Sequence, residues 1–156
     1  MCHYNKEMAT QKALDRTYMM MAKELSKLSS AQRAKVGAII VKDTHIIAEG
    51  YNGTPRGFNN VCEYYDYADH LHTKPEVLHA ETNAITKLAR STSSSDQSTL
   101  YVTLAPCYDC SKLIIQAGIK RVVYDESYLR DGLDLLKQAG VEVQKVKLEE
   151  EIRWMT

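Results

Sequence analysis

The sequence predicts one α/β domain, a three-layer α/β/α fold around a central mixed five-stranded sheet. Three observations lead to this prediction. The chain has 156 residues, 44% of them hydrophobic, which is enough for one domain with its own core, and we expect it to span residues 1–156. Two short apolar runs lie close together early in the chain and favour a β-hairpin. Helical and strand patterns then alternate, which is typical of a sheet flanked by helices.

The first elements are a helix and the hairpin. Apolar residues recur at spacings of three and four over residues 10–28, which predicts an amphipathic helix. Residues 36–41 (VGAIIV) are rich in β-branched side chains, as in a buried strand. A turn and a second strand over residues 45–50 complete the hairpin. Residues 51–74 have little periodicity and predict a long loop, which in a compact domain is usually functional or separately tied down.

The second half of the chain alternates helix and strand. Glycines at 118 and 140 fit the ends of two of the helices. A Ser-rich connection over residues 91–98 should lie at the surface. The predicted elements are a helix over 79–90, a strand over 99–104, a helix over 107–117, a strand over 120–124, a helix over 128–138, a strand over 141–146 and a charged helical tail over 147–156.

Charge and composition favour a small-molecule substrate. The formal net charge is zero, whereas a protein that follows a nucleic-acid backbone usually carries a basic excess. The first twelve residues are polar and resemble no signal peptide, and no apolar run approaches the roughly 18 residues that span a bilayer. We therefore expect a cytoplasmic protein with reduced cysteines that binds neither nucleic acid nor membrane, in the host cytoplasm if the source is viral.

Two short motifs predict a zinc site. His79-Ala80-Glu81 is followed, 28 residues after His79, by the segment PCYDC with Cys107 and Cys110. One imidazole and two thiolates give three zinc ligands, and a tetrahedral ion then has one position left for water. This H-x-E…P-C-x-x-C pattern is typical of zinc deaminases that act on nucleobases.

The motif residues predict a hydrolytic mechanism. Zinc lowers the pKa of its bound water, so hydroxide becomes available at neutral pH. Glu81 could accept that proton and return it to a ring nitrogen and then to the leaving amine. Hydroxide attack on an amidine carbon with loss of ammonia fits this arrangement.

Two alternatives stay open for the cysteines. A closed structural zinc site would need a fourth ligand, which Cys62, His70 or His72 could supply. A Cys-x-x-Cys after a strand could also be a redox pair. Separately, Cys62, His70 and His72 could bind a second metal ion, with Cys2 or His3 as a further ligand.

Several segments carry a family resemblance. They are residues 18–22 (YMMMA), 33–41 (RAKVGAIIV), 50–57 (GYNGTPRG), 79–85 (HAETNAI) and 106–110 (PCYDC). Through them about residues 12–145 resemble the cytidine deaminase-like superfamily and, within it, the deoxycytidylate (dCMP) deaminases. The zinc motif alone indicates only the superfamily, whereas residues 50–57 together with HAE-x-NAI indicate the dCMP branch.

The resemblance implies a reaction, regulation and assembly. The reaction is hydrolysis of dCMP to dUMP and ammonia, which feeds thymidylate synthesis. The enzymes are homo-oligomers, commonly hexamers, and many are activated by dCTP with Mg²⁺ and inhibited by dTTP. The implied effector residues are Gly50, Tyr51, Asn52 and Gly53, together with Arg90, which could instead be an exposed helix end.

Substrate contacts are predicted at Arg33, Asn52, Ala80 and Tyr128. A 5′-phosphate needs cations, and Arg33 precedes a predicted strand. Asn52 could hydrogen-bond a sugar hydroxyl, and Tyr128 resembles a family position near substrate. Each has a simpler interpretation: a solvated strand end for Arg33, turn chemistry for Asn52, and side-chain packing for Tyr128.

Three competing functions share parts of this pattern. A tRNA adenosine deaminase has the same zinc motif but would show more positive charge and a base-stacking surface. A nucleoside (cytidine) deaminase would not need cations for a phosphate. A zinc-binding interaction module would keep the metal without turnover. The sequence also leaves open whether dCTP is a substrate.

Overall fold

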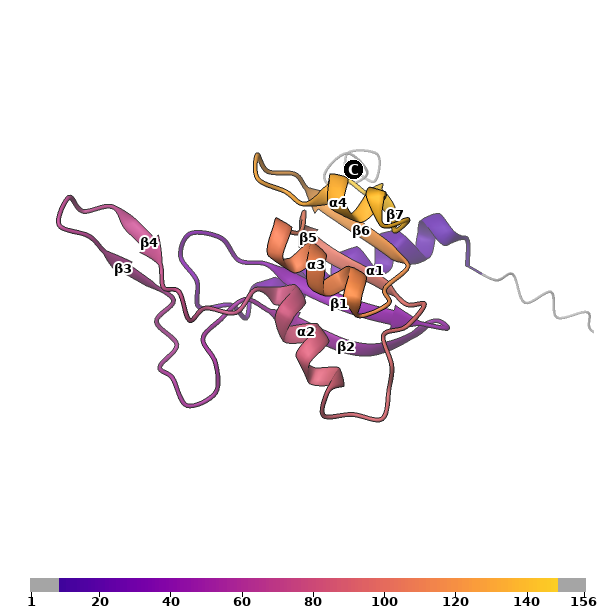
Figure 1. Cartoon of the computed structure of the whole chain (residues 1–156), viewed down its shortest axis with the longest axis horizontal. Helices are drawn as coiled ribbons and strands as arrows, with labels where there is room; N and C mark the ends of the chain where they lie inside the picture. The colour runs from indigo at the N-terminus through magenta and orange to yellow at the C-terminus, as the bar shows by residue number, and fades with distance from the viewer. Residues whose placement is uncertain (1–8, 149–156) are drawn as a thin grey trace, which may run out of the picture.

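A computed structural model describes residues 9–148 of the chain. Five strands form the main sheet and two short strands form a separate hairpin (Figure 1). Within residues 9–148, no helix is both long and apolar enough to span a bilayer. The elements are α1 (Gln11–Ser26), β1 (Gly37–Lys42), β2 (His45–Tyr51), β3 (Glu63–Tyr65), β4 (Leu71–Thr73), α2 (Ala80–Leu88), β5 (Thr99–Leu104), α3 (Tyr108–Gln116), β6 (Arg121–Glu126), α4 (Leu133–Gln138) and β7 (Glu142–Lys145).

The main sheet is mixed, with strand order β2-β1-β5-β6-β7. Strand β1 is antiparallel to both β2 and β5, whereas β5, β6 and β7 are parallel. The β1–β2 turn has positive φ at Asp43 and Thr44, as tight hairpins that follow the twist of their strands require. The parallel strands need crossover connections, and α3 and α4 provide them.

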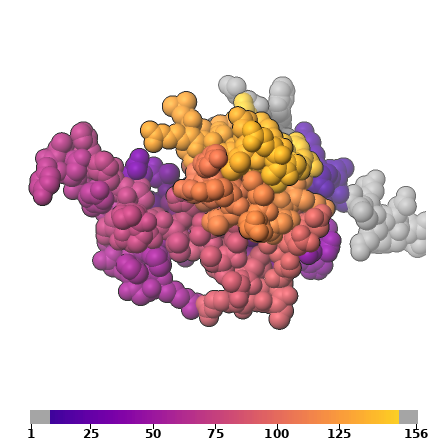
Figure 2. Space-filling model, viewed as in Figure 1, coloured from indigo at the N-terminus to yellow at the C-terminus, as the bar shows by residue number. Residues whose placement is uncertain are grey.

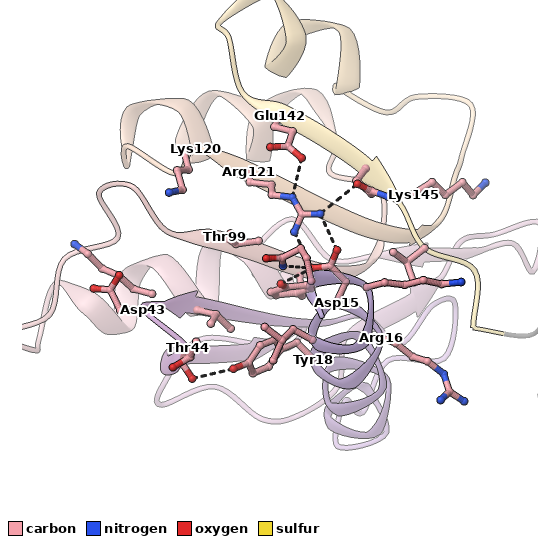
Figure 3. Close-up of a pocket in the computed structure, with 18 of the residues that line it drawn as sticks. Asp15, Arg16, Tyr18, Asp43, Thr44, Thr99, Lys120, Arg121, Glu142 and Lys145 are labelled. Carbon is pink, nitrogen blue, oxygen red and sulfur yellow. Dashed lines mark hydrogen bonds and ion pairs between the residues drawn. The ribbon is translucent and has the colours of Figure 1, made fainter. Parts of the chain in front are cut away.

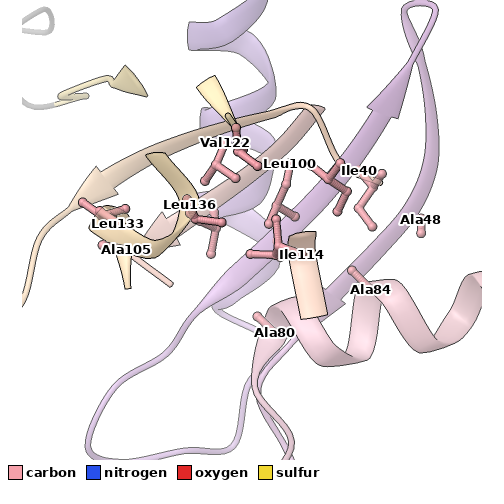
Figure 4. Packing of buried hydrophobic residues seen from close by; sticks show 14 of the residues in the cluster. Ile40, Ala48, Ala80, Ala84, Leu100, Ala105, Ile114, Val122, Leu133 and Leu136 are labelled. Carbon is pink, nitrogen blue, oxygen red and sulfur yellow. The ribbon is translucent and has the colours of Figure 1, made fainter. Parts of the chain in front are cut away.

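Helices cover both faces of the sheet. On one face, α2, α3 and α4 bury Ala84, Ile114 and Leu136 against Ile40 and Leu100 of the sheet (Figure 4). On the other face, α1 places Met19 and Ala22 in a second cluster, which also contains Ile39, Val41, Tyr101 and Val123. Successive strand residues therefore point to opposite helical layers. The predicted three-layer α/β/α fold is confirmed.

A buried ion pair fastens α1 to the sheet. Both carboxylate oxygens of Asp15 receive hydrogen bonds from the Arg121 guanidinium at 2.7 Å (Figure 3). The Tyr101 hydroxyl also donates to Asp15, at 2.7 Å. Burial raises the pKa of Asp15, but the hydrogen bonds from Arg121, Tyr101 and Gln11 outweigh this effect and leave the pKa below its ordinary value.

The segment predicted as a long loop contains the β3–β4 hairpin, which projects from the body of the protein (Figures 1 and 2). Its strands have three residues each, too few to show a period of two. Tyr64, Tyr65 and Tyr67 are exposed on it. At its base the Lys74 N–H donates to the Cys62 carbonyl at 2.9 Å, which closes the hairpin.

One predicted helix begins later in the structure, and another lies mostly outside the described residues. Helix α4 begins at Leu133 rather than 128, because the preceding residues turn back to the start of α3. There the Gly132 N–H donates to the Pro106 carbonyl at 2.7 Å, and Asp131 forms a β-bridge with Cys107. Most of the predicted C-terminal helix, residues 149–156, lies outside the described residues.

Gly50 permits the close approach of β2 and α2. A Cβ built at this position would lie 2.4 Å from the Ala80 carbonyl oxygen and 2.7 Å from the Ala84 nitrogen. We expect Gly50→Ala to push α2 off the sheet and to lower the free energy of unfolding by about 1–3 kcal/mol, as overpacking does. Urea unfolding monitored by circular dichroism measures this. Gly53→Ala is the matched control, since its Cβ would meet nothing within 4 Å. Equal effects of the two substitutions would contradict this explanation.

Candidate active site

Three potential metal ligands meet where α2 and α3 begin. His79 immediately precedes α2, Cys107 immediately precedes α3, and Cys110 lies in the first turn of α3. The His79 Nδ1 is 3.5 Å from the Cys107 Sγ and 3.3 Å from the Cys110 Sγ. The three ligand atoms all lie within 4.8 Å of one another. Ordinary zinc–sulfur and zinc–nitrogen bonds at tetrahedral angles separate the two kinds of ligand atom by about 3.5 Å. The donor set therefore fits zinc.

The electrostatics of the cluster favour the thiolate at Cys107 and the thiol at Cys110. Hydrogen bonds from the Cys110 thiol and the His79 ring lower the pKa of Cys107 to about 4, as does the Cys110 backbone N–H, which donates to its Sγ at 3.4 Å. The pKa of Cys110 is raised, because its thiol donates to Cys107 and is buried. A divalent cation between the sulfurs would favour the charged form of both thiols.

Glu81 is a buried carboxyl beside the ligand cluster. It lies in the first turn of α2, only 4% exposed. Burial raises its pKa to about 7. A carboxyl group with such a pKa can both accept and donate a proton near neutral pH, as general acid–base catalysis requires.

A cavity of about 330 Å³ joins these groups to the predicted substrate contacts. Arg33, Asn52, Ala80 and Tyr128 all line it, together with His79, Glu81 and Cys107. Tyr128 is half-buried, and burial raises its pKa to about 12. The remaining lining residues are Ala34, Val36, Glu63, Thr73, Val77, Leu104 and Ala105. Glu63 and Thr73 were not predicted, because they belong to the segment without periodicity.

Asn52 uses both ends of its side-chain amide on the backbone. Its Oδ1 accepts from the Val36 N–H at 2.8 Å, and its Nδ2 donates to the Ala34 carbonyl at 2.8 Å. These bonds fix the segment that leads into β1. Asn52 thus shapes the cavity wall through this segment, a role that the turn signal alone did not indicate.

Most of the predicted effector residues line a second hollow. Gly50, Tyr51, Asn52 and Gly53 surround a space of about 230 Å³ that Lys87 and Asn83 also border. Arg90 lies beyond the end of α2 and is exposed. It is not among the described residues that line this hollow.

The structure does not bring together the predicted second set of metal ligands. Cys62 is buried, with its Sγ 3.4 Å from the Ser30 hydroxyl. His70 and His72 lie on the projecting hairpin, where they cluster with Asp66 instead. Within residues 9–148, Cys62 belongs to neither cluster of potential metal ligands. Cys2 and His3 lie outside the described residues.

Comparisons with known proteins agree with this site. Residues 12–126 match the family described as the cytidine and deoxycytidylate deaminase zinc-binding region. Deoxycytidylate deaminase of enterobacteria phage T4 is 35% identical, over 83% of this chain and 88% of that protein. The Saccharomyces cerevisiae enzyme is 38% identical over 89% of this chain, which spans only 46% of the yeast protein. The dCMP deaminase from cyanophage S-TIM5, whose crystal structure contains dCMP and dUMP, is 47% identical in sequence. The two structures align with a TM-score of 0.82, and the alignment covers 88% of this chain and 100% of that one.

Fold and ligand cluster together define a zinc-binding hydrolase that acts on carbon–nitrogen bonds. The chain belongs to the cytidine and deoxycytidylate deaminase family, and the resemblance inferred from its motifs is confirmed.

Proposed function

We propose that the protein hydrolyses dCMP to dUMP and ammonia and so supplies the precursor of thymidylate. The observation that carries this proposal is the cavity itself, which brings the His79 and Cys107 ligands, the buried Glu81 carboxyl and the Arg33 guanidinium to one space. Its volume of about 330 Å³ is at the small end of the range of ligand pockets. Relatives named as deoxycytidylate deaminases support the choice of substrate.

We assign roles to the residues as follows. His79, Cys107 and Cys110 would hold zinc, which when bound makes a water molecule nucleophilic near neutral pH. Glu81 takes a proton from the water that attacks C4 of the cytosine ring. It passes that proton to ring N3, then takes a second proton from the new C4 hydroxyl and gives it to the departing amine, which leaves as ammonia when the C4–N bond breaks and the C4 carbonyl forms.

The other lining residues would position the nucleotide. Arg33 supplies a cation for the 5′-phosphate. Ala80 is fully buried beside Glu81, and its small side chain leaves room for the base at the start of α2. Tyr128 packs at the cavity wall, and Asn52 holds that wall in place through its two backbone hydrogen bonds.

Ammonia release from dCMP, deoxycytidine and dCTP, measured side by side, tests this function. We expect kcat/KM for dCMP to exceed that for deoxycytidine by about 10²-fold or more, since phosphate binding energy is used at the reacting centre. The change in ultraviolet absorbance gives the rates. Equal rates for dCMP and deoxycytidine would indicate a nucleoside deaminase. No turnover of any of the three would point to a polynucleotide substrate or to a zinc-binding module.

We also propose the regulation and assembly implied by the family. In this proposal dCTP with Mg²⁺ activates and dTTP inhibits a homohexamer, and the effector binds in the hollow at Gly50 to Gly53. The Lys87 ammonium borders that hollow and would attract the triphosphate of an effector. In the structure it forms an ion pair with Glu49 at 2.5 Å. Repeating the same assay with each nucleotide tests the regulation, and light scattering tests the assembly. The cytoplasmic location stays a prediction from the sequence.

A further inference from the structure

Thr82 brings a hydroxyl group to the sulfur of Cys110. It lies in the first turn of α2, directly after Glu81, and is half-buried. Its Oγ1 is 3.8 Å from the Cys110 Sγ, which is a hydrogen-bond distance because sulfur is larger than oxygen. The contact joins the two halves of the proposed zinc site, since His79 and Glu81 belong to the start of α2 and Cys110 to the start of α3.

The direction of this hydrogen bond follows from the chemistry of a metal ligand. A cysteine that binds zinc is a thiolate and has no proton to donate. The Thr82 hydroxyl must then be the donor. The Cys107 sulfur accepts from the Cys110 backbone N–H at 3.4 Å. Each sulfur of the site therefore has a donor of its own, a backbone N–H for Cys107 and the Thr82 hydroxyl for Cys110.

The local backbone leaves the Thr82 hydroxyl for this role. Threonines within helices commonly donate to the carbonyl four residues earlier, and Thr86 on the same helix does so, to the Thr82 carbonyl at 2.8 Å. For Thr82 the corresponding carbonyl is that of Leu78, which lies before the helix and accepts from the Gly53 N–H at 3.1 Å. The two threonines have the same side chain, but the first contacts the Cys110 sulfur and the second the backbone.

We propose that Thr82 is a positioning residue of the metal site, whose hydroxyl donates to the Cys110 thiolate and fixes that sulfur in place. The proposal rests on the proposed function, which makes His79, Cys107 and Cys110 the zinc ligands. The hydrogen bond holds the sulfur against rotation of its side chain and draws charge from it. A thiolate that donates less charge leaves the bound cation a stronger Lewis acid. Groups that orient a metal ligand in this way contribute about 10–100-fold to metal affinity or activity.

Three substitutions in the intact protein separate the hydroxyl group from the shape of the side chain. Thr82→Val removes the hydroxyl and keeps the branched shape of threonine, whereas Thr82→Ser keeps the hydroxyl. Thr86→Val is the matched control, since it removes a hydroxyl of the same helix that bonds the backbone. In competition with a chromophoric chelator, we expect Thr82→Val to bind Zn²⁺ about tenfold more weakly than the wild type, and the other two variants to stay within about twofold of it.

Loading the protein with Co²⁺ supplies a readout that does not depend on turnover. Cysteine sulfurs bound to Co²⁺ transfer charge to the metal and absorb in the near ultraviolet. Loss of a hydrogen bond raises the energy of the sulfur electrons, so this band should move to longer wavelength in Thr82→Val and keep its position in Thr82→Ser and Thr86→Val. Ammonia release from dCMP at saturating Zn²⁺ should follow the same order, with a loss of about tenfold in Thr82→Val.

The outcomes distinguish this proposal from the proposed function. A Thr82→Val variant with the Zn²⁺ affinity and the Co²⁺ band of the wild type would overturn the role of Thr82 while the ligand set stands. Equal losses in Thr82→Val and Thr82→Ser would also overturn it, because the hydroxyl would then not be the cause. A wild type that shows no thiolate band with Co²⁺ would overturn the proposed ligand set, and the role of Thr82 with it.

Discussion

Glu81→Gln should lower kcat for dCMP by about 10²–10⁴-fold, the usual contribution of a general acid–base group. The amide has nearly the shape of the carboxyl group but carries no transferable proton. Glu81 is buried and its pKa is raised to about 7, so a neutral replacement should leave the free energy of unfolding unchanged or slightly higher. Ammonia release gives the rate, and metal analysis of the purified variant should find the zinc content of the wild type.

The matched control for this experiment is Glu24→Gln. Glu24 is exposed on α1, where it pairs with Lys27 at 2.5 Å, and its loss should leave kcat unchanged. Activity near that of the wild type in Glu81→Gln would remove Glu81 from the mechanism. Loss of zinc together with activity would make it a metal-site residue instead.

Arg121→Met should lower the free energy of unfolding by about 3–5 kcal/mol, because it leaves the Asp15 carboxylate buried without its cation. The melting temperature should fall on the order of 10 °C in a chain of this size. Thermal unfolding monitored by circular dichroism measures both. Glu142→Gln is the control, since Glu142 contacts the same guanidinium at 2.9 Å but is 65% exposed, and such pairs contribute little.

A double substitution tests whether the unpaired buried carboxylate causes that loss of stability. Asp15→Leu combined with Arg121→Met removes the buried charge as well as its partner, and stability should largely return. Acid supplies a second check. Because the pKa of Asp15 is lowered in the folded state, its stabilisation is present above the ordinary pKa of 3.8 and is lost as pH falls through the folded value. A double variant as unstable as Arg121→Met would contradict the ion-pair account.

The parts of the site that the sequence predicted are those encoded in short stretches. His79 and Glu81 occupy one helix start and Cys107 and Cys110 another, so the local pattern fixes both their chemistry and their orientation. The alternating elements of the main sheet were predictable for the same reason, since their apolar periods reflect burial on one or both faces.

The unpredicted parts depend on contacts between distant segments. Glu63 is held by backbone N–H groups about thirty residues earlier in the chain, and Asp15 pairs with a residue 106 positions away. Asn52 is followed by a glycine, as is typical of a turn, but its side-chain amide forms hydrogen bonds with the backbone of Ala34 and Val36. The second metal site was predicted from residue types alone, and the hairpin separates Cys62 from the histidines.

The closed base of the β3–β4 hairpin has a consequence for how this segment can vary in length. Because the chain returns on itself at Cys62 and Lys74, insertions or deletions beyond that base change only the entropy of closing a surface loop. Each doubling of loop length adds only about 0.6 kcal/mol to that closure. Glu63 and Thr73, which line the cavity, flank the variable stretch. The tip can thus change in length while the two residues at its root keep their places in the cavity wall.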